Sequence, residues 1–232
     1  MVPAAGQGDA REGGGGRKQV PRSHEDRRVS VLQMHWWDYS MRKEMLECMH
    51  HVDDLRKEGK IGAIALTNFD TAHVELFLRE GIPIVSNQVQ FSLIDARPLS
   101  KMAPFCAKNG VQLLTYGTLA GGLLTDRWLG KPQPTSRADL PTPSLSKYYN
   151  MIAQWGSWAK FQGLLATLRR VADRHNVSVA NVATKWVLDQ PSVAGVIVGL
   201  RARTPRRTAA RSRSSSPTPT APRSRRCDMA TT

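Results

Sequence analysis

Cysteine is scarce in this 232-residue chain, which has three, at Cys48, Cys106 and Cys227, far apart in sequence. No Cys-x-x-Cys pair and no cysteine–histidine spacing typical of zinc ligands is present, so we expect no metal site. Isolated cysteines of this kind are typical of free thiols in a reducing compartment. We therefore expect a cytoplasmic protein.

Long hydrophobic runs are also missing. The longest late apolar run, residues 193–200, is far shorter than the roughly 20 residues that span a bilayer. The first residues contain no apolar segment of the kind found in secretory signals. The sequence therefore predicts neither membrane insertion nor secretion.

Acidic residues are few, 19 against 33 Lys and Arg, and the net charge of +14 is unevenly distributed. Residues 201–232 carry nine Arg and a single acidic residue, whereas residues 31–200 carry 18 basic and 14 acidic ones. Residues 1–30 are rich in Gly and Arg and could not bury a core. We predict a mildly basic globular domain over 31–200 between two disordered basic segments, 1–30 and 201–232.

Within residues 31–200, short apolar runs alternate with segments of helical period. We expect strands at Val31–His35, Ile61–Leu66, Ile84–Phe91, Val111–Thr115 and Val193–Val198. We expect helices at Met41–Glu58, Thr71–Arg79, Pro98–Asn109, Lys160–His175 and from Ser178 to about Asp189. This alternation predicts right-handed crossovers and a parallel α/β sheet, but it does not distinguish a barrel from an open sheet. A Pro- and Gly-rich excursion, Gly117–Ser157, separates the fourth strand from the later helices.

Four side chains lie at or near the ends of successive predicted strands: His35, Asn68, Gln88 and Tyr116. In parallel β/α folds the C-terminal ends of the strands meet on one face, where such folds place their chemistry. Each residue alone has a plainer interpretation: a core histidine, a turn residue, a partner for backbone groups and a core-filling ring. Their joint position favours a shared ligand site.

Five stretches together resemble the aldo-keto reductase family. They are LQMHWWDY (32–39), DDLRKEGKIGAIALTNFD (53–70), IVSNQVQFSLID (84–95), GVQLLTYGTLAGGLL (110–124) and VAGVIVG (193–199). The resemblance implies a (β/α)8 TIM-type barrel, of which the five predicted strands would be the last five. It also implies reduction of an aldehyde or ketone by hydride transfer from NADPH.

For the catalytic residues, the resemblance is incomplete. His35 matches the family's catalytic histidine, which orients the carbonyl. The family's Asp, proton-donating Tyr and Lys precede the strand at Val31, and residues 1–30 show no counterpart. We therefore expect the chain as given to be inactive. Trp36 and Trp37 match aromatic positions at the substrate mouth, although plain packing explains them equally well.

For the residues that hold the cofactor, the resemblance is more complete than for the catalytic residues. The Thr67-Asn68 pair and Gln88 match the family's nicotinamide carboxamide ligands, and Tyr116 matches the ring that stacks on the nicotinamide. Amides suit this task because they offer both donors and acceptors. Arg201 stands where the family grips the 2′-phosphate of NADP, but Pro205 and the Arg/Ser tail replace the helix expected there.

Other interpretations remain open. The chain could be a non-catalytic binding or interaction protein whose basic tail associates weakly with RNA or is phosphorylated at Ser216 or Thr218, although a solvated disordered tail is commoner. The abrupt change of composition at Arg201 is also what a shifted reading frame produces. Unpaired strand edges of a partial barrel would favour a homo-oligomer.

Overall fold

The structure is a computed structural model that describes residues 28–36, 38 and 42–199. The two segments predicted to be disordered, 1–30 and 201–232, therefore lie almost wholly outside the described residues. Trp37 and Arg201 also lie outside them. Their proposed roles stay predictions.

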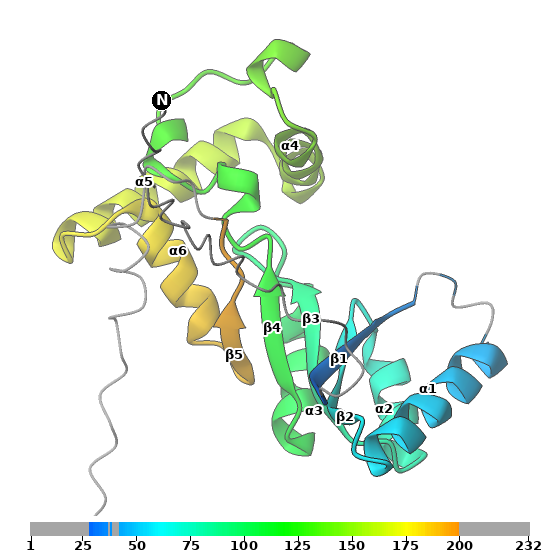
Figure 1. Ribbon diagram of the computed structural model, residues 1–232. Helices are drawn as coiled ribbons and strands as arrows, with labels where there is room; N and C mark the ends of the chain where they lie inside the picture. Colours follow the sequence, from blue (N-terminus) through cyan, green and yellow to red (C-terminus); the bar gives the residue numbers. More distant parts are fainter. Residues whose placement is uncertain (1–27, 37, 39–41, 200–232) are drawn as a thin grey trace, which may run out of the picture.

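A five-stranded parallel sheet forms the centre of the described chain (Figure 1). Its strands pair in chain order, and each predicted strand is present to within two residues at either end: β1 (Val29–His35), β2 (Ile61–Thr67), β3 (Ile84–Gln90), β4 (Gln112–Tyr116) and β5 (Val193–Val196). The α/β prediction is confirmed. Within the described residues, β1 pairs only with β2 and β5 only with β4, so the sheet has two open edges.

Helices connect the strands, as parallel pairing requires. They are α1 (Arg42–Lys57), α2 (Thr71–Arg79), α3 (Met102–Asn109), α4 (Pro143–Trp155), α5 (Trp158–Arg174) and α6 (Val179–Leu188). Polar side chains begin two of them as expected, because Asp70 accepts from the backbone N–H of His73 and Ser178 from that of Asn181. Gly110 ends α3 in the left-handed conformation, with a φ of 71°.

One predicted helix is shorter than expected. The expected helix Pro98–Asn109 is divided into a 3₁₀ turn, Arg97–Leu99, and α3, since the backbone leaves the helical region at Lys101 (φ −137°). The excursion Gly117–Ser157, for which no helix bounds were predicted, contains α4. Thr142 caps that helix and Pro143 begins it, a start signal readable in the sequence.

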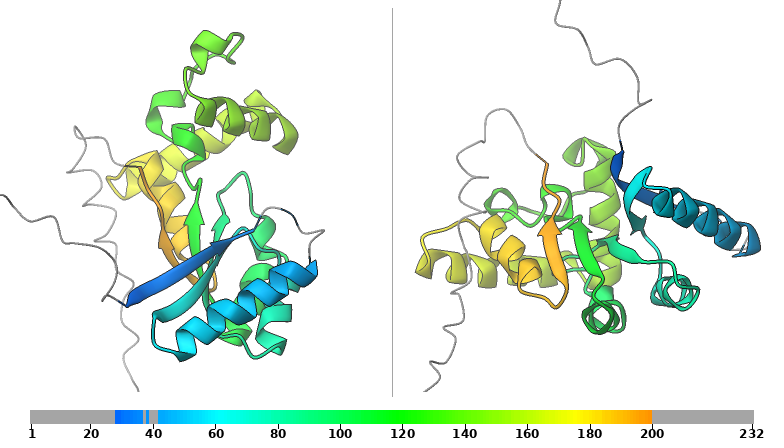
Figure 2. Two further views of the ribbon diagram at one scale, coloured as in Figure 1. Left: turned by 45° about the vertical axis from the view of Figure 1, so that its right-hand side comes forward. Right: turned by 60° about the horizontal axis from the view of Figure 1, so that its bottom comes forward.

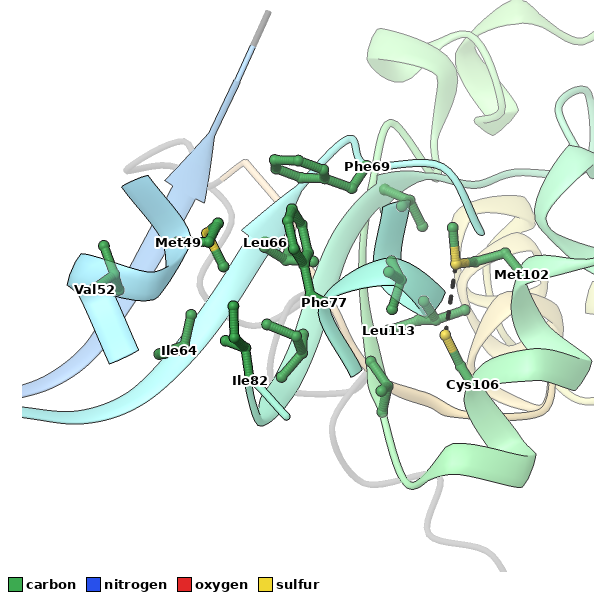
Figure 3. Close-up of a cluster of buried hydrophobic side chains, with 14 of the residues drawn as sticks. Met49, Val52, Ile64, Leu66, Phe69, Phe77, Ile82, Met102, Cys106 and Leu113 are labelled. Carbon is green, nitrogen blue, oxygen red and sulfur yellow. Dashed lines mark hydrogen bonds between the residues drawn. The ribbon is translucent and has the colours of Figure 1, made fainter. Parts of the chain in front are cut away.

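The main hydrophobic core lies between one face of the sheet and helices α1 to α3 (Figure 3). Met49 of α1, Phe77 of α2 and Cys106 of α3 pack with Ile64 and Leu66 of β2, among others. All five side chains are inaccessible to solvent. Because strand residues alternate between faces, this packing sends every second residue of the strands to the opposite face.

A second hydrophobic cluster joins α4, α5 and α6. Helix α4 lies beyond the C-terminal ends of β3 and β4, and α6 runs beside β5 (Figures 1 and 2). The aromatic centre of the cluster is Trp128, Trp158 and Phe161, with the rings of Trp158 and Phe161 5.3 Å apart. The cluster fixes the excursion after β4 above the strand ends.

The opposite face of β1 is open to solvent. Leu32 and Met34 pack against the core, whereas Val31, Gln33 and His35 are exposed. Val29 and Val31, 44% and 50% exposed, are unusually open for strand valines. In the part of the chain that the structure describes, no helix is long and apolar enough to cross a membrane.

Candidate functional site

The strand register brings three of the predicted site residues side by side. His35, the last residue of β1, pairs with Thr67, the last residue of β2. Thr67 in turn pairs with Gln88 on β3. The three side chains therefore follow one another across the C-terminal edge of the sheet, where parallel strands place a ligand.

Asn68 and Tyr116 meet above this row. Asn68 follows β2 with a φ of 62°, a left-handed conformation that asparagine tolerates better than most residues. Its backbone N–H donates to the carbonyl oxygen of Gln88 at 2.8 Å, which anchors the turn to β3. The Tyr116 hydroxyl, from the end of β4, donates to Asn68 Oδ1 at 2.9 Å. The strained turn thus holds the amide against the tyrosine.

Gln33 is a site residue that sequence reasoning missed. It lies on β1 two residues before His35 and therefore on the same face. Its Nε2 donates to Thr67 Oγ1 and, at 3.1 Å, to Gln88 Oε1, so that one side chain joins β1, β2 and β3. The sequence did contain a signal for Gln33, because residues two apart in a strand share a face and Gln33 lies two residues before His35. That signal is weak in a single strand.

Lys147, from the unpredicted helix α4, brings a positive charge to the same edge. Its ammonium lies 5.7 Å from the ring centroid of Tyr116 and 5.2 Å from that of Tyr148, within cation–π range. No local sequence signal marked Lys147, because its position depends on how the second cluster packs.

A buried carboxylate supports β3 beside the site. Asp95 is 4% exposed, and Arg97 holds it through two hydrogen bonds of 2.6 and 2.8 Å. Gln90, which pairs with Tyr116, donates to it at 2.7 Å. Burial alone would raise the pKa of Asp95, but the hydrogen bonds from Arg97 and Gln90 outweigh it and hold that pKa below its ordinary value.

A groove of about 480 Å³ runs along the outside of this edge. Its walls include Asn68, Tyr116, Thr71, Arg97 and Lys101. It is open rather than enclosed, and it begins where Asn68 meets Tyr116. The groove extends the candidate site toward the start of α3.

Trp36 is the remaining predicted site residue that the structure describes. Trp36 packs partly against the main core, and its indole N–H donates to the carbonyl oxygen of Asp38 at 2.7 Å. This contact accords with the packing interpretation of Trp36. Over residues 28–36, 38 and 42–199, no group of three His, Cys, Asp or Glu side chains could hold a metal ion.

Comparison with known proteins decides the ancestry. The profile of the Aldo/keto reductase family matches residues 17–211. This chain belongs to the aldo/keto reductase family. The match extends beyond both limits of the predicted domain, 31–200.

Proteins with several different names are similar to this chain in sequence or in structure. The chain is 28% identical to the flagellar radial spoke protein 5 of Chlamydomonas reinhardtii, over 69% of this chain and 33% of that protein. It is 24% identical to the NADH-specific methylglyoxal reductase of Escherichia coli, over 75% of this chain and 51% of that protein. The glycerol dehydrogenase of Gluconobacter oxydans matches in structure with a TM-score of 0.54 at 26% identity, over 73% of this chain and 49% of that one.

The chain thus spans about half the length of these relatives, or less. The five parallel strands and their helices match part of the fold of aldo-keto reductases, which the resemblance implied.

Proposed function

We propose that the strand-end cluster binds the nicotinamide of NADP(H). Thr67, Asn68 and Gln88 form what we call the carboxamide clamp, and Tyr116 offers an aromatic face beside it. In the family's reaction the bound cofactor supplies a hydride to an aldehyde or ketone. The task of this chain is to hold the nicotinamide in one orientation, with His35 at the neighbouring strand end to orient the carbonyl oxygen.

The hydrogen bond between Tyr116 and Asn68 is the observation that carries this proposal. It joins residues 48 positions apart, one with an aromatic face and one with an amide. Both lie near the C-terminal edge of the sheet, close to the paired residues Thr67 and Gln88. Amide and hydroxyl groups complement a carboxamide, and a ring beside them can stack on a pyridine. The donor set therefore fits a nicotinamide.

The preference for NADP over NAD depends on how the chain contacts the 2′-phosphate, which only NADP carries. Arg201, the candidate for the 2′-phosphate, is followed by a sequence unlike the family's, and one relative is named for NADH. We expect binding weaker than is usual in the family, with little preference for NADP(H) over NAD(H). Titration of tryptophan fluorescence with both cofactors measures this preference.

A pair of variants tests the site. Tyr116→Leu removes the ring and the donor to Asn68, and should weaken binding of NADP(H) about tenfold or more, as for a lost stacking contact and hydrogen bond. Gln112→Ala, at the opposite end of the same strand, serves as the control and should bind like the wild type. A folded wild-type chain that binds neither cofactor would contradict the proposal.

A second candidate function is a non-catalytic binding or interaction protein. One observation favours it: a relative is named as a flagellar radial spoke protein. In this case the nicotinamide would be a structural or regulatory ligand. Weak RNA association or phosphorylation of the basic tail belongs to this candidate. A cytoplasmic location and homo-oligomers formed through exposed strand edges are proposed for either candidate.

Turnover distinguishes the two candidates. A general acid typically contributes about 10²–10⁴ in rate. We therefore expect the purified 232-residue chain to show no appreciable NADPH-dependent reduction of an aromatic aldehyde. Turnover at the level of family enzymes that His35→Ala abolishes would establish the enzyme and remove the non-catalytic candidate.

A further inference from the structure

Gln33 occupies a position from which it can control the carboxamide clamp. It comes from β1, whereas Thr67 ends β2 and Gln88 lies on β3, and its Nε2 reaches both. We propose that Gln33 is a positioning residue that fixes which hydrogen-bonding groups Thr67 and Gln88 turn toward a nicotinamide carbonyl oxygen. This inference rests on the proposed function.

The direction of the two hydrogen bonds carries the argument. A glutamine amide presents an oxygen acceptor on one side and an NH2 donor on the other, and rotation about its last bond exchanges them. Since Gln33 donates to Gln88 Oε1, the Nε2 of Gln88 is turned away from Gln33. The Thr67 hydroxyl likewise accepts from Gln33, so its own proton is left to donate elsewhere.

Both groups are thereby held as donors. The clamp then offers an N–H from Gln88 and an O–H from Thr67, a pair that suits an acceptor. In a nicotinamide carboxamide the acceptor is the carbonyl oxygen. It follows that the clamp recognises that oxygen, and that the ligand's own NH2 group matters less.

Three ligands separate these contributions. NADP⁺ carries the whole carboxamide. Its 3-acetylpyridine analogue keeps the carbonyl oxygen but replaces NH2 with a methyl group. Adenosine 2′,5′-bisphosphate has no nicotinamide at all. We expect the wild-type chain to bind NADP⁺ and the analogue with similar affinity, measured by isothermal titration or by saturation-transfer NMR.

Two substitutions at Gln33 then test the positioning role. Gln33→Leu removes both hydrogen bonds and should weaken NADP⁺ and its analogue about three- to tenfold, as for one or two neutral hydrogen bonds. Binding of adenosine 2′,5′-bisphosphate should not change. Gln112→Leu, an exposed glutamine at the beginning of β4, is the matched control and should leave all three affinities unchanged.

Gln33→Glu gives the signature that a merely structural residue would not. The substitution keeps the size of the side chain but leaves only acceptors, so Gln88 should turn its Nε2 toward the new carboxylate and offer Oε1 to the ligand. The acetylpyridine analogue, which has no N–H to donate, should then lose more affinity than NADP⁺. Because Gln33→Glu is nearly isosteric, it also tests the proposal if Gln33→Leu does not fold, as judged by circular dichroism.

The outcomes are separable. A folded wild-type chain that binds no nicotinamide ligand contradicts the proposed function, and this inference with it. A wild-type chain that binds NADP⁺, together with a Gln33→Leu chain that binds it equally well, contradicts this inference alone. Equal losses for all three ligands would also overturn it, because they would indicate a general disturbance of the fold.

Discussion

At the scale of single residues, Asn68 combines a backbone and a side-chain role. Its left-handed φ of 62° turns the chain out of β2, and its Oδ1 accepts from Tyr116. Non-glycine residues in strained backbone conformations gather at functional sites, where the surrounding structure holds them in place. Two substitutions can separate the roles.

We expect Asn68→Gly to keep the turn and to lose the acceptor for Tyr116. Its stability should stay close to that of the wild type while its affinity for NADP(H) falls. Asn68→Ala should lose the same affinity and, in addition, about 1 kcal/mol of unfolding free energy, because alanine lacks the short polar side chain through which asparagine tolerates the left-handed region. Urea denaturation and cofactor titration of both variants check this, and equal stabilities would argue against strain at Asn68.

Asp95 predicts a pH dependence. Its pKa is held below the unfolded value of about 3.9 by Arg97 and Gln90, despite burial. Its contribution to stability should therefore be present above about pH 4 and be lost as the pH falls through the folded pKa. We expect Asp95→Asn to reduce the free energy of unfolding by about 1–3 kcal/mol at pH 7, since a buried charge-assisted bond is lost.

As the pH falls below about 4 the difference between the two proteins should shrink, because the wild-type carboxyl becomes protonated as well. Urea titrations over a series of pH values from 7 downward measure the difference. A stability difference that stays the same across the whole series would mean that the charge of Asp95 does not contribute. Asp173, an exposed carboxylate on α5, provides the control as Asp173→Asn.

At the scale of elements, α4 shows how a start signal can be overlooked within a Pro- and Gly-rich segment. Thr142 Oγ1 accepts from the backbone N–H of Leu145 at 3.2 Å. We expect Thr142→Ala to destabilise the protein by about 1 kcal/mol, with faster amide exchange in α4. Thr167→Ala, where a mid-helix hydroxyl bonds back to Gly163, is the matched control and should be close to neutral. Unchanged exchange in α4 would show that the cap is dispensable.

The sequence was informative wherever a local pattern determines the element. The five strands, the helix begun by Asp70 and the stop at Gly110 followed from apolar runs, caps and glycine. The candidate site residues at the strand ends could be predicted from their place in the sequence, because parallel strands bring their C-terminal ends together. Gln33 and Lys147 could not, since one depends on a reach across three strands and the other on the packing of a distant helix.

At the scale of the whole molecule, the open edges of the sheet matter most. In the region that the structure describes, β1 and β5 each lack a second neighbour, and Val29 and Val31 stand exposed on β1. Unpaired strand edges recruit other strands, especially when they carry apolar side chains. The described chain therefore presents a surface suited to self-association.

We expect the purified chain to form oligomers or aggregates in size-exclusion chromatography with light scattering. Val31→Lys should shift it toward monomers, because a charge on an edge strand opposes further pairing. Val177→Lys is the control: Val177 is also exposed, at 37%, but lies in the connection between α5 and α6 and not on an edge strand. A monodisperse wild-type monomer with a cooperative, high-temperature melt would contradict this expectation.

The order of the strands also bears on how the polypeptide reaches its folded state. Each strand pairs with the one before it in the chain, so every new β/α unit finds its docking surface already synthesised. The connections between β1 and β4 are the shorter ones, whereas β4 and β5 are joined across residues 117–192, so pairing β5 costs more loop-closure entropy. Because pairing between distant segments is slow, β5 should be the last of the five strands to dock.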